Sequence, residues 1–108
     1  PCPVKDQAVN TSKTEIEIAT YCAEVMEKRG EDKVTCCPKD LLEVVRDAGL
    51  KADLLQIRCI FKDNWGLRSD KNSDYIFYHI GTDGELFPMR KKGRYYEVSR
   101  SLVERLLL

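Results

Sequence analysis

Reactive side chains are scarce in this sequence, which contains one histidine, His79, and five cysteines. A cysteine and the histidine could pair across space as nucleophile and base, but no cysteine lies within a recognisable catalytic signature. Zinc sites usually include two ligands spaced C-x₂₋₄-C, and no pair of cysteines here has that spacing. The cysteines are better explained as small buried hydrophobic residues. They are Cys2, Cys22, Cys36, Cys37 and Cys59.

Other kinds of catalytic site have no more support. The chain contains neither G-x-G-x-x-G nor G-x-x-x-x-G-K-[ST], so no loop is predicted to cradle phosphates for catalysis. The adjacent pair Cys36 and Cys37 precedes a predicted helix, whose N-terminus would lower a thiol pKa, and this is the best redox candidate. Neighbouring acids fall on solvated faces or in turns. We therefore expect a protein that is not an enzyme, with no catalytic residue, no metal site and no cofactor.

The most suggestive segment for binding is the cationic run from residue 90 to residue 94, which two tyrosines follow. Residues 91–93 are predicted to form the tip of a β-hairpin. The cations of such a tip can lie along phosphates while an aromatic ring stacks on a base. The alternative is an exposed edge hairpin that lysines protect from aggregation. Other cations extend the patch if they share its face, namely Arg58, Lys62, Arg68 and Arg100. The predicted nucleic-acid contacts are Arg90, Lys91, Lys92, Arg94 and Tyr95.

Two functional hypotheses follow. The first is a non-catalytic binding module that contacts a nucleic acid, DNA or RNA, or another anionic surface through the basic hairpin. The second is a protein–protein interaction or scaffolding domain of a larger protein. In that case the partner docks on an apolar patch formed by Trp65, Leu67 and the leucine-ended C-terminus. A steep salt dependence would favour the first hypothesis, because phosphate contacts release counterions.

Local patterns predict where the helices and strands lie. Apolar residues recur at helical spacing after residue 13, with Ser12 as the cap and Gly30 as the stop. Alternating apolar residues favour a strand over 52–62, although a helical stripe fits there as well. The remaining predictions are a short strand near 34–37, a helix over 38–49, a polar loop over 63–73, strands over 74–80, 85–90 and 94–99 joined by two glycine-ended turns, and a helix over 100–108.

These elements predict one α+β domain over residues 13–108, preceded by a tether over 1–12. Two N-terminal helices are followed by an antiparallel meander of three or four strands and a short C-terminal helix. The strand over 74–80 is expected to be central, and Pro88 marks the next strand as an edge. A winged helix is the alternative: 41–45 and 53–61 would be two helices joined by a turn, and 91–93 the tip of the wing.

Composition excludes several classes of protein. The chain has 108 residues, of which 18 are basic and 18 acidic, and 43% are hydrophobic. No apolar run approaches the roughly 20 residues of a membrane-spanning helix, and no leader or lipidation motif is visible, so we expect a cytoplasmic protein without membrane contact. Residues 1–50 carry 7 basic and 10 acidic side chains, whereas residues 51–108 carry 11 and 8. Positive charge is therefore concentrated in the second half.

Overall fold

The first helix begins and ends where the sequence indicates. The computed structural model describes residues 12–68 and 72–107, so the predicted tether lies outside the described residues except for Ser12. Helix α1 (Lys13–Arg29) has a complete capping box between Ser12 and Glu15 and ends at Gly30, whose φ is +67°. Its buried face includes Ile18, Cys22 and Val25 and packs against much of the core. The predictions for this helix are confirmed.

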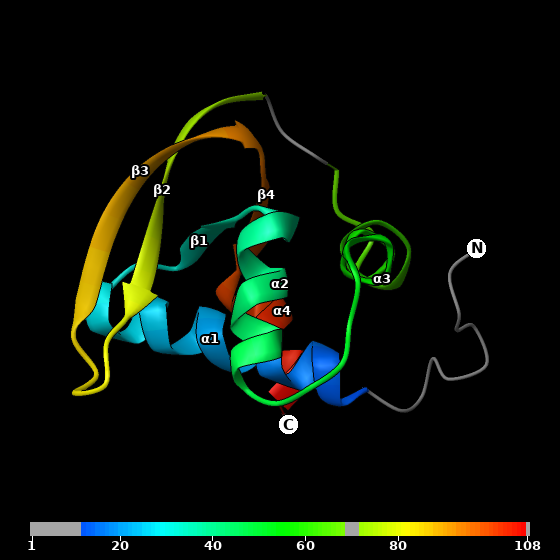
Figure 1. Ribbon diagram of the computed structural model, residues 1–108, viewed down its shortest axis with the longest axis horizontal. Coiled ribbons are helices and arrows are strands. Elements are labelled where there is room, and N and C mark those ends of the chain that lie inside the picture. Colours follow the sequence, from blue (N-terminus) through cyan, green and yellow to red (C-terminus); the bar gives the residue numbers. More distant parts are fainter. Residues whose placement is uncertain (1–11, 69–71, 108) are drawn as a thin grey trace.

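A short strand and a second helix follow. Strand β1 (Lys33–Cys36) leads into α2 (Pro38–Asp47), which starts with proline at its first position, where no backbone N–H is needed. Leu41 and Val45 are fully buried on the inner side of α2. In Figure 1, α2 stands upright while the next helix is seen end-on, so these two helices cross at a steep angle.

The strand predicted over 52–62 is wrong, because this segment is helical. Helix α3 (Leu54–Cys59) continues into the π-helical turn η2 (Ile60–Asn64). The Asp53 side chain caps α3 by accepting a hydrogen bond from the Gln56 N–H at 2.8 Å. Ile57, Ile60 and Phe61 are buried, which is the spacing of one helical face. The period-two alternation is therefore coincidental, and tertiary packing selects the helical stripe.

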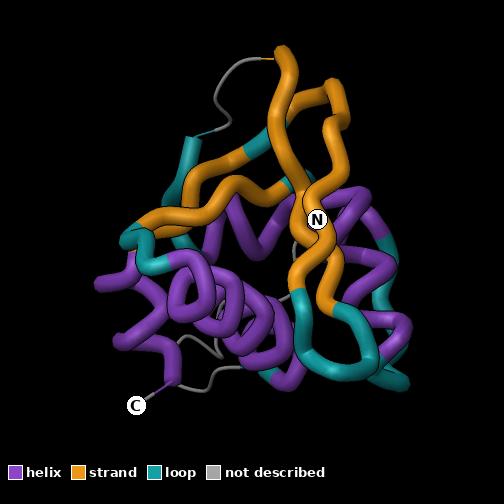
Figure 2. The backbone as a smooth tube through the Cα atoms, turned by 90° about the vertical axis from the view of Figure 1, so that its left-hand side faces the viewer, coloured by secondary structure: helices purple, strands orange, loops and turns teal. Residues whose placement is uncertain are grey.

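Strands β2 (Asn72–Ile80) and β3 (Leu86–Arg94) form a long antiparallel ribbon that arcs along one side of the molecule (Figures 1 and 2). The turn at 81–84 is confirmed, with Gly84 at φ +86°. The predicted second turn at 91–93 is wrong, because β3 runs through these residues and Gly93 pairs with Ser73. Gly93 is not among the glycines with positive φ. Among the described residues β2 pairs with β3 alone, so it is not a central strand.

The predicted meander is replaced by two separate two-stranded sheets. Strand β4 (Tyr96–Ser99) follows β3 after Tyr95 but pairs with β1, not with the ribbon. Helix α4 (Arg100–Leu107) closes the chain and packs on α1. Arg100 Nε donates to Asp32 Oδ1 at 2.8 Å and so ties the start of α4 to the turn before β1. The fold is therefore α+β, with four helices and two antiparallel sheets in the described part of the chain.

Candidate anion-binding cleft

A cleft of about 870 Å³ opens between the first turns of α2, one side of α3 and the last residues of β3. Six of its lining side chains are cationic and two are acidic, so the surface carries a clear excess of positive charge. The cations come from three elements that are far apart in the sequence. They are Lys39 from α2, Arg58 and Lys62 from α3–η2, and Lys91, Lys92 and Arg94 from β3.

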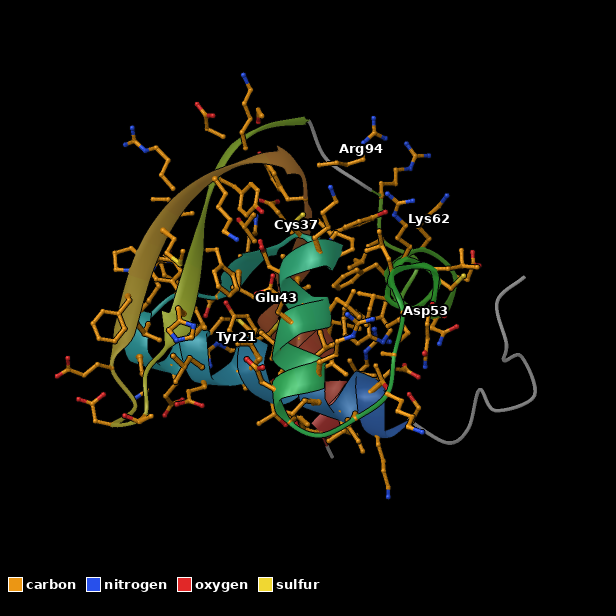
Figure 3. The ribbon with its side chains drawn as sticks, in the orientation of Figure 1. Tyr21, Cys37, Glu43, Asp53, Lys62 and Arg94 are labelled. Atoms are coloured by element: carbon orange, nitrogen blue, oxygen red, sulfur yellow. The ribbon has the colours of Figure 1, made fainter. Side chains whose placement is uncertain are left out.

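Helical geometry places Arg58 and Lys62 on the same wall of the cleft. They are separated by four residues, about one helical turn, and therefore project from one side of α3–η2. Both side chains are exposed, whereas Ile57 and Phe61 beside them are fully buried and hold the helix against the core. Figure 3 shows Lys62 and Arg94 near each other beyond the end of α2 at which Cys37 lies.

The deepest charged group of the cleft is Asp40, which is only 4% exposed. Lys91 Nζ donates to Asp40 Oδ1 at 2.7 Å, and the Tyr75 hydroxyl donates to Asp40 Oδ2 at 2.5 Å. Lys91 also lies 5.1 Å from the centre of the Phe77 ring, within the range of a cation–π contact. This Asp40 anchor, formed by Asp40, Lys91 and Tyr75, joins α2 to both strands of the ribbon. It also compensates the charge of Lys91 inside the chain.

The Asp40 anchor shifts two protonation equilibria in the same direction. The hydrogen bond to Asp40 raises the pKa of Lys91, because the carboxylate favours the charged ammonium. Burial raises the pKa of the Tyr75 phenol well above its usual value, and the hydrogen bond to Asp40 adds to the shift. Both groups therefore remain protonated throughout the neutral range, and the anchor persists there.

The predicted nucleic-acid contacts lie at a different place from the hairpin tip where they were expected. Lys91, Lys92 and Arg94 line the cleft at the end of the ribbon opposite to the 81–84 turn. Arg90 is exposed opposite Ile76 and is not part of the lining. Tyr95 is half-buried, with its ring 5.6 Å from that of Tyr75, and it is not part of the lining.

Two of the four cations that were expected to extend the basic patch line the cleft. Arg58 and Lys62 line it, whereas Arg68 does not and Arg100 is paired with Asp32. Sequence reasoning missed Lys39 and Asp40, which the helical pattern assigns to the solvated face of α2. No sequence signal distinguishes them from other charged residues of that face, because only the approach of the ribbon makes this part of α2 a site.

The predicted partner-binding residues pack on their own domain. Trp65 Nε1 donates to Glu15 Oε1 at 3.0 Å, and its ring meets the Phe61 ring edge-on at a centroid distance of 5.3 Å. Leu67 is half-buried and also packs against the core. These contacts give both residues a structural role in the domain.

The histidine and the cysteines lie in unrelated places. His79 is exposed on β2 with its ring 6.5 Å from that of Phe87. Cys22 and Cys36 are fully buried with their sulfur atoms 3.4 Å apart, Cys37 lines the cleft, and Cys59 is disulfide-bonded. Within residues 12–68 and 72–107 no three histidine, cysteine or acidic side chains converge in a way that could hold a metal ion.

Two further findings bear on function. In the described part of the chain, every helix is too short or too polar to cross a lipid bilayer. No protein-family model, curated protein or solved structure matches this sequence or its fold.

Proposed function

We propose that this protein is a non-catalytic binding module that holds a nucleic acid by its phosphates in the cationic cleft. The observation that carries the proposal is the convergence of six cations from three elements on one concave surface. Like charges gathered in this way repel one another and weaken the fold, whereas a polyanion that enters the cleft relieves the repulsion. Lys91 has its charge compensated by Asp40 of the lining in a contact at 2.7 Å.

The elements follow one another in the order of the winged helix, the alternative fold, but their sheet pairing and charge differ from it. The order α1, β1, α2, α3, β2, β3 is that of a winged helix, with the steep α2–α3 pair as its helix–turn–helix and the ribbon as its wing. The tip of the ribbon lacks the positive charge that a phosphate-binding wing would need. Residues 81–85 at the tip include Asp83 and Glu85 and no cation. Phosphate contacts are therefore assigned to α3 and the opposite end of the ribbon.

Salt-dependent binding provides the test. A labelled oligonucleotide is titrated by fluorescence anisotropy at several salt concentrations between about 50 and 200 mM. With about four phosphates neutralised, the logarithm of the association constant should fall with a slope of roughly −3 against the logarithm of salt. A slope near zero would contradict the proposal.

A pair of double variants shows whether the cleft is responsible. Arg58→Ala with Lys62→Ala removes two cleft cations, and we expect a loss of affinity of at least about tenfold and a shallower salt slope. The matched control, Lys33→Ala with Arg105→Ala, removes the same charge from exposed positions outside the cleft. Equal losses in the two double variants would show that net charge alone drives binding, and would reject the cleft.

Docking of a protein partner is the second candidate function, and one observation favours it. Phe87 and Met89 on β3 are 49% and 45% exposed, which is unusual for large apolar side chains on a strand. This surface replaces Trp65 and Leu67 as the candidate patch. Concentration-dependent sedimentation of the protein that is lost on Phe87→Ser with Met89→Ser would support it, and sedimentation as a monomer at all concentrations would count against self-association.

A further inference from the structure

We infer that the cleft takes a single-stranded nucleic acid with its phosphates inward and its bases outward, so that binding is independent of base sequence. This inference rests on the proposed function and specifies its ligand. It is carried by the shape of the cationic surface, by the chemistry of the lining residues and by the burial of the aromatic rings.

The shape of the surface favours a single strand. Proteins read a double helix by inserting a protruding helix or ribbon into a groove. Here the cations instead line a hollow, with α3 on one side, β3 on the other and the start of α2 between them. Its volume of about 870 Å³ lies within the range of pockets that enclose individual ligands, about 300–1,000 Å³. One sugar–phosphate chain can enter such a hollow, whereas a duplex would meet only its rim.

The described part of the lining lacks amide and aliphatic hydroxyl side chains, which are among those that contact base edges. Its polar members are lysines, arginines, two acids, two tyrosines and one cysteine, without any asparagine, glutamine, serine or threonine. Asparagine and glutamine form paired hydrogen bonds with adenine, and hydroxyl side chains supply adaptable contacts to base edges. Lysine and arginine are the usual partners of phosphate oxygens. The predominance of lysine and arginine in the cleft therefore suits the sugar–phosphate backbone of the ligand.

The aromatic rings of the lining are not available for stacking. Proteins that bind single strands with bases inward present exposed aromatic faces. In this cleft Tyr75 and Tyr96 are only 8% and 4% exposed. The Tyr75 hydroxyl is bound to Asp40, and the Tyr96 ring is stacked on Phe61 at a centroid distance of 5.0 Å. Bases gain no stacking by pointing inward, so the phosphates occupy the interior.

Acidic residues of the lining limit which cations can contact phosphates. Asp40 compensates Lys91, so the contribution of Lys91 to phosphate binding is reduced. Glu43 lines the cleft one turn further along α2, where its carboxylate repels a phosphate (Figure 3). Cations that line the cleft without such a partner in the lining, including Lys39, Arg58, Lys62 and Lys92, are therefore the main phosphate contacts.

The experiment compares probes that differ in bases and in strandedness. Anisotropy titrations use labelled strands of about 15 nucleotides, which is within the usual site size of single-strand binders. The probes are oligothymidylate, oligocytidylate, an abasic strand with the same number of phosphates, and a duplex of the same length. We expect the three single strands to bind within about threefold of one another and the duplex to bind at least about fivefold more weakly. Lys62→Ala should weaken all three single strands equally, and Glu43→Gln should strengthen them about twofold.

Each other outcome has a defined meaning. A more than tenfold preference between the two homopolymers, or tight binding that is lost with the abasic strand, would show that bases are read and overturn the inference. Tighter binding of the duplex would overturn it as well while leaving the proposed function intact. If a nucleoside triphosphate competes at concentrations as low as those at which the strand binds, the ligand is a small phosphorylated molecule, and the inference of a single strand is rejected. Absence of salt-dependent binding to every probe would instead reject the proposed function.

Discussion

The two ends of the β2–β3 ribbon share one ladder of backbone hydrogen bonds but differ in charge and in how they are held. The base, residues 72–76 and 90–94, carries four cations on β3 and is fixed to α2 by the Asp40 anchor. The tip, residues 81–85, carries two acids and no cation. Its turn is closed by local contacts, such as the hydrogen bond from the Gly81 N–H to the Glu85 carbonyl at 2.8 Å. The strand ends beside the turn pack on α1, where the Tyr21 hydroxyl donates to the Tyr78 carbonyl at 2.7 Å. Both ends are therefore held to the domain, the base through charged groups and the tip through α1, and the candidate site lies at the base.

This difference explains why a chain without net charge can be a candidate polyanion binder. A neutral total reflects cancellation over the molecule, whereas binding depends on the local field in a concave site. The cleft has an excess of cations, and the tip is one of the places where compensating acids lie. The following predictions test whether base and tip differ as described.

Alkaline pH should have the largest effect on stability, because it deprotonates Lys91 and Tyr75 in the Asp40 anchor. The pKa values of Tyr75, Lys91 and Tyr21 are raised in the folded protein. The folded state thus holds these protons more tightly, and the stabilisation is complete below pH of about 10 and lost as pH rises further. Tyr75 and Tyr21 should each reduce the free energy of unfolding by about 1.4 kcal/mol per pH unit there, and Lys91 acts in the same direction.

Tyrosinate absorbance and circular dichroism, followed together, check this prediction. Two phenols should ionise only as the helical signal disappears, since burial is the main cause of the raised pKa values of Tyr21 and Tyr75. The Tyr75→Phe variant should show a dependence of stability on pH that is smaller by about one proton. Ionisation of all five tyrosines before any loss of helical signal would contradict this account.

Removing the charge of Asp40 should have the next largest effect. Asp40→Asn leaves the ammonium of Lys91 without its carboxylate and weakens the bond to Tyr75. Breaking a buried ion pair costs about 3–5 kcal/mol, and we expect about 2 kcal/mol here because Lys91 is partly exposed. The melting temperature should fall by roughly 10 °C. At the tip Asp83→Asn keeps an Oδ1 that can accept from the Glu85 N–H, so it should cost less than about 0.5 kcal/mol. Similar losses in both variants would remove the distinction between base and tip.

Charge reversal at the two ends should change binding by different amounts. Lys92→Glu places an acid in the cleft and should weaken oligonucleotide binding about tenfold, equivalent to about 1.4 kcal/mol. Asp83→Lys adds the same magnitude of charge at the tip, outside the lining, and should change the dissociation constant less than about twofold at physiological salt because of screening. A tenfold gain from Asp83→Lys would place the ligand on the tip.

The smallest effect is expected from alanine at Gly84 and Gly93. Gly84 has φ +86°, so Gly84→Ala should cost about 1 kcal/mol of stability. Gly93 at the base lies within a strand, and a Cβ there would meet its nearest atom, Tyr75 Cε1, at an ordinary 3.8 Å. Gly93→Ala should therefore be neutral or stabilising by a few tenths of a kcal/mol. Chemical denaturation measures both, and equal costs would contradict the turn and strand assignments.

The predictable parts of the fold are those determined by local interactions. The Ser12 and Glu15 cap, the stop at Gly30 and the turn at 81–84 depend on a few neighbouring residues, and each was predicted. The helix over 54–64 was missed because its apolar residues satisfy two periods at once, and burial against the core decides between them. The strand through Gly93 was missed because its partner, Ser73, lies in a segment that resembles a loop.

The candidate site was predictable in its cations but not in its shape. The run from 90 to 94 and the pair Arg58 and Lys62 stand out by charge alone, and five of the six cationic lining residues were named in this way. Lys39 and Asp40 were not, since their importance comes from a contact between segments separated by 51 residues. Sequence composition identifies charged side chains, whereas long-range packing determines which of them converge.

The passage from β3 to β4 has a mechanical consequence. Tyr95 alone separates the two strands, and its ring is held against Tyr75. Within the described residues 72–107 no loop lies between the ribbon, β4 and α4, because α4 begins at the next residue after β4. The base of the ribbon is therefore joined closely to the β1–β4 sheet and to the terminal helix.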